Sequence, residues 1–239
     1  TVLQGKGFKV FFVDRHNATG EYLAPHQLDH RPYMYVLLMV YHVHCIIGIS
    51  AVGAIKAPIN GPELSPGDLV RARNAIDYVG DPYTFMMGGF TDPKAFHRPT
   101  DHLFCPMMGS QLPARGVLLA NSLPGPRYET RHEIDIRRRD GVDVVGMTTA
   151  FPEAVLAGEG AVPYGLICGV ANMAPADHSG DFVKRNMEEV VLPKTKRAVE
   201  GAIAGVIRKD NWPDLHRDCV CRCGREKSVF YTVTGLPRF

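Results

Sequence analysis

The sequence predicts a single α/β domain in which a mixed central β-sheet is flanked by helices. Short apolar runs rich in β-branched residues alternate along the chain with segments whose apolar residues recur at helical spacing. Of the 239 residues, 45% are hydrophobic and 22% are charged, which excludes a disordered chain. Strands that alternate with helices form parallel or mixed sheets with helices packed on their faces.

The strands are expected where apolar runs are short and end at charged or small residues. In chain order these runs are residues 9–13, 45–50, 68–71, 117–120, 143–147 and 166–170. The first of them is expected to be a buried strand that ends at Asp14. Helices are expected where the period is close to 3.6, at residues 31–41, 130–139 and 182–207.

The domain is assigned to residues 1–210, and residues 211–239 are assigned to a Cys-rich tail that we expect to be peripheral. Cys45, Cys105 and Cys168 are isolated in apolar surroundings, which is typical of buried free thiols.

Three further cysteines, Cys219, Cys221 and Cys223, alternate in the tail. A redox or disulfide role and adventitious free thiols both fit this spacing. A metal site would need a fourth ligand, for which His216 is the local candidate. No metal is predicted for the functional site.

Composition also bounds the location and the partners of the protein. A net charge of +2 argues against a dedicated nucleic-acid binder. No apolar stretch approaches the ~20 residues of a membrane span, and the first residues show no signal-peptide pattern. We therefore expect a cytoplasmic protein that binds neither nucleic acid nor membrane.

Candidate functional residues follow the predicted strands, where ligands of α/β sheets bind. Arg15 can hold an oxyanion through its fork of donors, and His16 adds another donor. The segment from Ser50 to Gly53 offers a hydroxyl and backbone N–H groups to a phosphate. Taken singly, these residues are equally well explained as solvated loop residues and ordinary strand-to-turn sequence.

Taken together, they form a spaced series of motifs. The early members are Arg15-His16, Pro25-His26, Ser50-Ala51-Val52-Gly53 and Pro66-Gly67-Asp68. The later members are Gly125-Pro126-Arg127-Tyr128-Glu129-Thr130, Gly146-Met147-Thr148-Thr149 and Pro152-Glu153-Ala154. From about Phe8 to Arg208 the series resembles the trimeric purine nucleoside phosphorylase and methylthioadenosine phosphorylase family.

The resemblance implies a nucleoside phosphorylase-like fold and a phosphorolytic reaction. Phosphate attacks the anomeric carbon of a purine nucleoside and releases the base and ribose 1-phosphate. The resemblance implies phosphate-binding roles for Arg15, His16, Ser50 and Thr148. It implies contacts with the sugar and base for Ala51, Gly53, Tyr128 and Met147. It also implies a homotrimer that needs no cofactor, with inorganic phosphate as co-substrate.

Two positions address the choice of base. Asn172 falls where family members place Asp or Asn against purine N7, and an amide can both accept from N7–H and donate to a 6-oxo group. Family members that act on 6-aminopurines instead carry Asp at this place and a second Asp two residues on, where this chain has Ala174. Glu129 falls where oxopurine members accept N1–H. Asn172 and Glu129 are therefore the expected catalytic pair, although Asn172 alone is also explained as a cap at a strand end.

Met187 bears on which 5′ substituent of the sugar the protein accepts. Family members that bind a free 5′-hydroxyl can carry His at this place, so Met187 suggests an apolar substituent, as in 5′-methylthioinosine. Core packing of a methionine at helical spacing explains Met187 equally well. His97 resembles a residue that reaches the neighbouring subunit's site.

The chain also departs from the family pattern. Members carry a strand and a Gly-rich phosphate loop well ahead of the Arg-His pair, whereas this sequence begins at Thr1. We therefore expect either that the sequence is part of a longer protein or that the phosphate site is incomplete.

The sequence thus predicts a phosphate-dependent phosphorylase of 6-oxopurine nucleosides, of the inosine and guanosine type, that serves purine salvage. A methylthioadenosine phosphorylase is the alternative within the same class. A nucleoside-binding protein without turnover and a hydrolase that uses water are alternatives from other classes.

Overall fold

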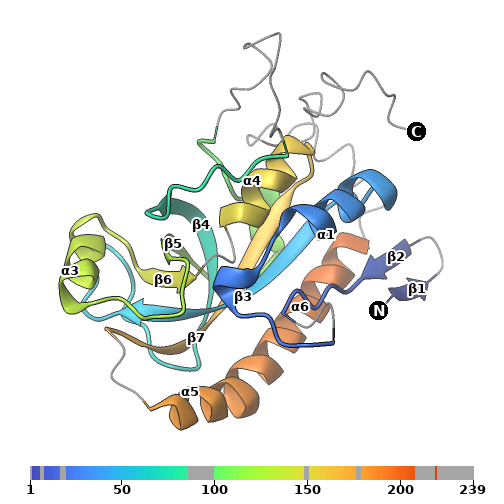
Figure 1. Ribbon diagram of the computed structural model, residues 1–239. Coiled ribbons are helices and arrows are strands. Elements are labelled where there is room, and N and C mark those ends of the chain that lie inside the picture. The colour runs from blue at the N-terminus through green and yellow to red at the C-terminus, as the bar shows by residue number, and fades with distance from the viewer. Residues whose placement is uncertain are drawn as a thin grey trace.

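The computed structural model describes residues 2–5, 8–16, 20–85, 100–147, 151–175, 179–207 and 219. Five strands form its central sheet: β3 (Ile46–Ile55), β4 (Leu69–Asp77), β5 (Arg115–Leu123), β6 (Val144–Met147) and β7 (Tyr164–Ala174). The pairs β3–β7, β4–β5 and β5–β6 are parallel, and β3–β6 and β4–β7 are antiparallel. The sheet is therefore mixed, and the predicted α/β fold is confirmed (Figure 1).

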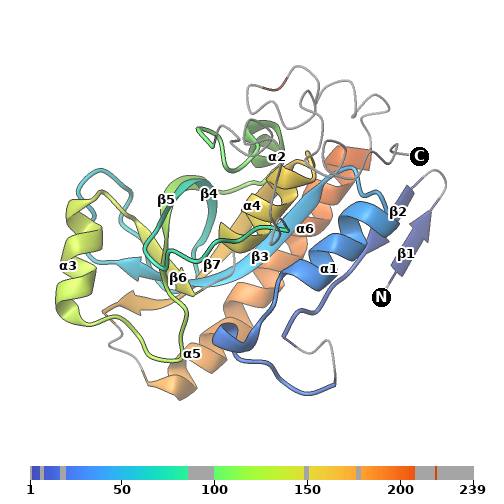
Figure 2. The ribbon, with the colours of Figure 1, turned by 45° about the horizontal axis from the view of Figure 1, so that its top comes forward.

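The helices of the described chain lie around this sheet (Figures 1 and 2). They are η1 (Pro25–Gln27), α1 (Arg31–Tyr35) continued by η2 (Val36–Val40), α2 (Pro106–Gln111), α3 (Arg131–Arg139), α4 (Phe151–Glu159), α5 (Gly180–Asn186), η4 (Met187–Val191) and α6 (Leu192–Ile207). The helices predicted at 31–41, 130–139 and 182–207 are confirmed. The sequence analysis missed α2 and α4.

The core consists of two layers that meet on β7. Successive side chains of a strand point to opposite faces of its sheet. Leu166 and Cys168 belong to the cluster that contains residues of α1 and α4, such as Met34. Ile167, between them, belongs instead to the cluster that contains Ala202 of α6. β7, buried except at Met173, thus anchors helices on both faces, which explains its nearly continuous apolar sequence.

The long C-terminal helix is irregular at η4. Its backbone takes π-helical geometry over Met187–Val191, shortly before Pro193. A proline inside a helix lacks an N–H donor and clashes with the carbonyl four residues before it. A π-turn ahead of Pro193 is a common way to accommodate that clash.

The predicted buried strand at 9–13 is wrong in its extent and its surroundings. The strand found is β2 (Phe8–Phe11), and it pairs antiparallel with β1 (Val2–Gly5) in a separate two-stranded sheet. Phe12 and Val13 follow it and are 46% and 44% exposed. Each strand of the main sheet already pairs with two others, so β2 has its own partner outside it.

The strands that carry candidate site residues are longer than predicted. β3 and β7 pair in parallel from Ile46–Tyr164 as far as Ile55–Ala174. Ser50, Gly53 and Asn172 therefore lie within strands and do not follow them, and the interpretation of Asn172 as a cap at a strand end is wrong. The long parallel ladder satisfies the backbone across residues that usually end strands.

Of the three cysteines predicted to be buried, Cys105 and Cys168 are buried, whereas Cys45 is only half-buried. Burial raises the pKa of Cys45 to about 11 and that of Cys168 to about 12, so both stay protonated at neutral pH. Cys105 is not isolated, because its Sγ lies 3.6 Å from Sγ of buried Cys219. At Cys219 the tail is therefore not peripheral.

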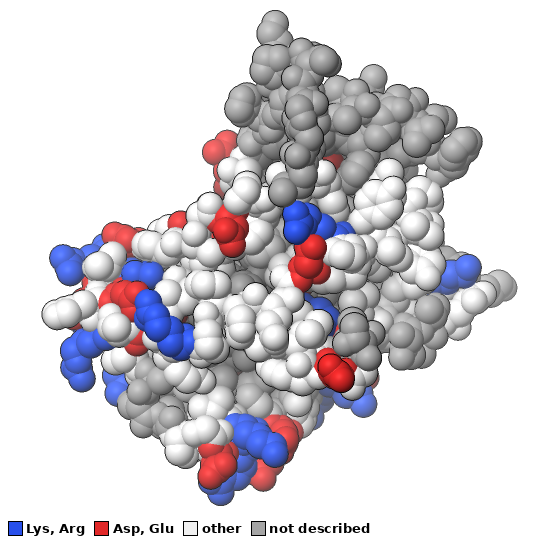
Figure 3. All heavy atoms as spheres, in the orientation of Figure 1, with Lys and Arg blue, Asp and Glu red and all other residues white. Residues whose placement is uncertain are grey.

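The remainder of the tail, including His216, Cys221 and Cys223, lies outside the described residues. On the face in Figure 3, acidic and basic side chains are interspersed, in line with the small net charge. In the part of the chain that the structure describes, no helix combines the length and the apolar character needed to cross a membrane.

Candidate active site

Arg15 links β3, which carries the candidate phosphate-binding residue Ser50, to α4. One terminal nitrogen, Nη2, donates to the backbone oxygen of Ile49 on β3 at 2.9 Å. The other, Nη1, lies 3.2 Å from Oε1 of Glu153 on α4. The Arg15 side chain is only 15% exposed. The guanidinium is thus held next to Ser50, the residue after Ile49.

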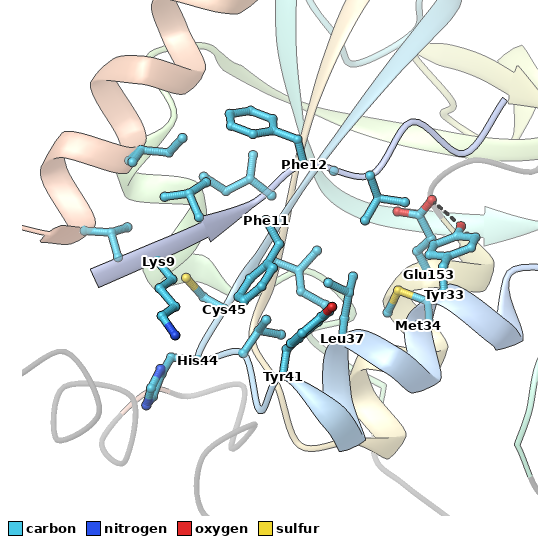
Figure 4. A pocket seen from close by; sticks show the side chains of 18 of the residues that line it. Lys9, Phe11, Phe12, Tyr33, Met34, Leu37, Tyr41, His44, Cys45 and Glu153 are labelled. Atoms are coloured by element: carbon cyan, nitrogen blue, oxygen red, sulfur yellow. Dashed lines mark hydrogen bonds between the residues drawn. The ribbon is translucent and has the colours of Figure 1, made fainter. Parts of the chain in front are cut away.

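Glu153 is the centre of a buried polar network. Its Oε1 accepts a hydrogen bond from Tyr33 at 2.8 Å, and its Oε2 accepts one from Tyr164 at 2.5 Å. Nδ1 of His30 lies 2.5 Å from the Tyr33 hydroxyl and 3.7 Å from Glu153 Oε1. Figure 4 shows the bond between Glu153 and Tyr33. Two donors besides Arg15 therefore satisfy this carboxylate in the interior.

The network keeps Glu153 ionised. Burial alone would raise the pKa of this carboxyl, but the hydrogen bond from His30 and the charge of Arg15 outweigh it, so the pKa lies below its usual value. Burial and the carboxylate together raise the pKa values of the Tyr33 and Tyr164 phenols. Both tyrosines consequently remain hydrogen-bond donors at neutral pH.

A cavity of about 1050 Å³ lies beside this network. Apolar side chains from β2, η2, β3 and α6 line most of it, and Arg15, Tyr33 and Glu153 contribute polar groups to its wall. Figure 4 shows Tyr33 and Glu153 at one end of the cavity and Lys9 at the other.

The other predicted phosphate-binding residues have different surroundings. Ser50 is buried, and its hydroxyl donates to the backbone oxygen of Ala51 at 3.0 Å. Nδ1 of His16 lies 2.8 Å from the backbone oxygen of Leu23, and its ring stacks on Tyr22. The structure thus turns His16 toward the chain that follows it. Thr148 lies outside the described residues.

Gly53 and Asn172 meet across the sheet, at the end of β3 opposite the Arg15 contact. A Cβ atom on residue 53 would lie 3.5 Å from Asn172 Nδ2. Val52 pairs with Val170, but Gly53 pairs with Asn172, so Ala171 is the extra residue of a β-bulge. Bulges re-aim side chains and are common beside active sites. Here the bulge sets the direction of the Asn172 side chain.

The Asn172 side chain is buried, and its amide nitrogen already makes a hydrogen bond within the chain. Its amide nitrogen donates to the backbone oxygen of Met173 at 2.8 Å. Its Oδ1 remains an acceptor that can meet a protonated purine N7. One of the two N–H groups of the amide is thus used within the chain, and the second is the one left for the predicted donation to a 6-oxo group.

Gly125 brings three predicted motifs together. A Cβ on residue 125 would lie 3.3 Å from Sδ of Met147, 3.8 Å from Cβ of Pro25 and 3.9 Å from Nδ1 of His26. Its φ is +93°, which favours glycine strongly over other residues. The loop after β5, the end of β6 and η1 therefore converge at this point.

The loop that carries Tyr128 and Glu129 is fixed by the start of α3. Thr130 accepts from the backbone N–H of Glu133 at 3.2 Å, and Glu133 accepts from the backbone N–H of Thr130 at 2.7 Å, which is a capping box. Both Glu133 oxygens also accept from Arg127 at 2.8 Å. Tyr128 itself is 54% exposed. No hydrogen bond joins Glu129 to Asn172, both of which the structure describes.

The capping box gives a stability prediction. Thr130→Ala removes the side-chain acceptor at the N-cap of α3, so the free energy of unfolding should fall by about 1 kcal/mol. Thermal unfolding followed by circular dichroism measures this loss. Thr100→Ala, in an exposed loop segment, is the matched control and should leave the melting temperature unchanged. Equal melting temperatures for both variants would contradict the assigned cap.

Met187 and His97 complete the predicted set. Met187 is half-buried and begins η4. The preceding residue, Asn186, donates to the backbone oxygens of Val170 and Ala171 at 3.2 and 3.0 Å. The turn that bears Met187 is thus tied to the bulge beside Asn172. His97 lies outside the described residues.

Nothing in the sequence predicts a role in the site for the four residues of this network, which are Glu153, Tyr33, Tyr164 and His30. Glu153 was noted only as part of a motif, although a lone acid in the apolar string 151–157 could have signalled a buried, partnered charge. Tyr33 lies in the helix predicted at residues 31–41, and helical periodicity does not reveal that its hydroxyl reaches α4. These contacts are long-range and emerge only from the fold.

Comparison with known proteins places the chain in a family. The family model described as "Phosphorylase superfamily" matches residues 33–204. A probable 6-oxopurine nucleoside phosphorylase of Moorella thermoacetica is 32% identical over 230 residues, which cover 91% of this chain and 81% of the relative. A probable S-methyl-5′-thioinosine phosphorylase of Methanopyrus kandleri is 30% identical, with coverage of 86% and 80%.

The fold is also found in a solved structure. A methylthioadenosine phosphorylase from an antarctic soil metagenomic library superposes with a TM-score of 0.75 at 23% identity, covering 93% of this chain and 77% of that one. This likeness agrees with the mixed sheet and its flanking helices. The match over residues 33–204 shows that the chain belongs to the phosphorylase superfamily.

Proposed function

We propose that this protein is a purine nucleoside phosphorylase that cleaves the N-glycosidic bond of 6-oxopurine nucleosides with inorganic phosphate. The arrangement of β3 carries the proposal. Arg15 contacts the middle of the strand at Ile49, directly before Ser50, and Gly53, three residues after Ser50, meets Asn172. Three residues of strand span roughly 10 Å, which accommodates a ribose between a phosphate and a purine.

In the proposed reaction the phosphate binds at Arg15 and Ser50, with Thr148 and His16 as further expected partners. Guanidinium and hydroxyl donors favour an anion and can orient it toward the anomeric carbon. An anionic nucleophile needs no general base, so the protein has mainly to stabilise the departing base. Asn172 Oδ1 would accept a hydrogen bond from the protonated N7 of the departing base in the transition state. We propose no cofactor.

The choice of base rests on Asn172 and Glu129. Glu129 would accept N1–H of hypoxanthine or guanine, whereas N1 of adenine is itself an acceptor. A buried mismatch of this kind costs about 1–3 kcal/mol. The relatives named 6-oxopurine and methylthioinosine phosphorylases agree with this preference.

Methylthioadenosine phosphorylase remains the second candidate. A relative with that name from Ajellomyces capsulatus is 29% identical over 95% of this chain. An apolar Met187 beside the Asn172 bulge favours a methylthio group at the 5′ position over a free hydroxyl, so 5′-methylthioinosine is a proposed substrate. We also propose a homotrimer, in which His97 would reach a neighbouring site, on the family resemblance alone.

Base release from three nucleosides tests the proposal. Inosine, 5′-methylthioinosine and 5′-methylthioadenosine are each incubated with the protein, with and without phosphate. We expect hypoxanthine from the first two only when phosphate is present, and the slowest cleavage for the adenine compound. The faster of the two inosine compounds decides the role of Met187.

The other outcomes separate the alternatives. Cleavage of 5′-methylthioadenosine alone would contradict the roles of Asn172 and Glu129 but keep the reaction. Base release without phosphate would indicate a hydrolase. No release under any condition would indicate a binding protein.

A further inference from the structure

We propose that Glu153 is a positioning residue of the phosphate site, acting through Arg15. The inference rests on the proposed function, because it assumes that Arg15 binds phosphate. It concerns a residue that is buried and contacts the guanidinium, so that its proposed action on phosphate is indirect.

The geometry of Arg15 is the first support. Its two terminal nitrogens are directed to different elements, one to Glu153 on α4 and one to Ile49 on β3. Two anchors on separate elements fix the plane of a guanidinium, whereas one leaves it free to rotate. Arg15 Nε is buried and has no hydrogen-bond partner among the described residues. A buried donor without a partner is costly, so a ligand oxygen is the expected acceptor.

The fixation of Glu153 itself is the second support. A carboxylate can orient an arginine only if its own position is set. Tyr164 holds Oε2 and Tyr33 holds Oε1, and His30 in turn contacts the Tyr33 hydroxyl. The donors come from β7 and from α1, with His30 directly before α1. Glu153 is therefore fixed from elements on either side of it.

The direction in which Glu153→Gln changes phosphate binding distinguishes a positioning role from a purely electrostatic one. A carboxylate beside an anion site repels phosphate, so Glu153→Gln should by charge alone tighten phosphate binding. Positioning predicts the opposite, because a neutral amide holds Arg15 by a weaker bond than a carboxylate does. We expect the KM for phosphate to rise about tenfold in Glu153→Gln, while the KM for the nucleoside stays within twofold.

A double-mutant cycle tests whether the effect passes through Arg15. In an Arg15→Lys background, where the planar fork is already lost, Glu153→Gln should change the KM for phosphate less than twofold. Glu159→Gln is the matched control. It removes a buried carboxylate from the same helix, but one that accepts from the backbone N–H of Phe85. This control should leave the KM for phosphate unchanged.

The outcomes are distinct. An unchanged or lower KM for phosphate in Glu153→Gln, or the same fold-change in both backgrounds, would overturn the inference while the wild-type protein remained phosphate-dependent. Base release by the wild type without phosphate would instead overturn the proposed function, and this inference with it. Should Glu153→Gln not fold, Tyr164→Phe removes one anchor of Glu153 and keeps its charge. A rise of about threefold in the KM for phosphate is then expected, and no rise would contradict the positioning role.

Discussion

Arg15→Lys should lower kcat/KM for phosphate by about 100-fold, because lysine keeps the charge but loses the planar fork of donors. In the wild type, that fork contacts Glu153 and the Ile49 backbone oxygen simultaneously, with Nε left for a ligand. A single ammonium cannot reproduce three fixed directions. Lysine also keeps a positive charge beside the buried Glu153 carboxylate. A neutral residue at position 15 would leave that carboxylate unpaired and would destabilise the fold. Steady-state kinetics at varied phosphate measures the effect.

Arg31→Lys is the matched control for this substitution. Arg31 lies in the same part of the chain but is exposed and paired with Asp29. Exposed pairs of this kind contribute little, so its kinetics should match the wild type. If Arg15→Lys also kept the wild-type kcat/KM for phosphate, Arg15 would not be a phosphate ligand.

Asn172→Asp should shift the ratio of kcat/KM values for 6-oxo and 6-amino nucleosides by about 10- to 100-fold toward adenine. A carboxylate can accept both from N7–H and from a 6-amino group, but it repels a 6-oxo oxygen. The change also removes the amide donor now bound to the Met173 oxygen. Matched assays with 5′-methylthioinosine and 5′-methylthioadenosine measure the ratio.

Asn60→Asp controls for the added negative charge, since Asn60 is exposed. It should leave the ratio unchanged. The thermal stability of Asn172→Asp must be compared as well, because the new carboxylate is buried. An unaltered base preference in a folded Asn172→Asp protein would contradict the role given to this residue.

The fold class could be predicted from local patterns, because most elements are amphipathic or continuously apolar. The helices at 31–41, 130–139 and 182–207 each carry a clear apolar face, and Thr130 signals the start of α3. The ends of the strands could not be predicted from local patterns. Gly53 and Asn172 look like chain breakers, yet the parallel ladder of β3 with β7 extends beyond both. Pairing between distant segments thus decided where these strands end.

The candidate site was predictable only in part for the same reason. The family resemblance implies a shared phosphate-binding role for Arg15 and Ser50, and Arg15 contacts the residue beside Ser50. The network behind Arg15 was not expected. Glu153 meets Tyr33, which is 120 residues away in sequence, and no local pattern encodes such a contact. The bulge that aims Asn172 likewise arises from register between two strands.

The identity of the sugar product tests the central claim most directly. Inosine is converted by the wild-type protein in phosphate buffer and in a phosphate-free buffer, and the products are followed by ³¹P NMR and by hypoxanthine absorbance. A phosphorylase forms ribose 1-phosphate in equal amount with hypoxanthine and stalls without phosphate. Free ribose, formed at the same rate in both buffers, would contradict phosphorolysis and with it the role proposed for Arg15.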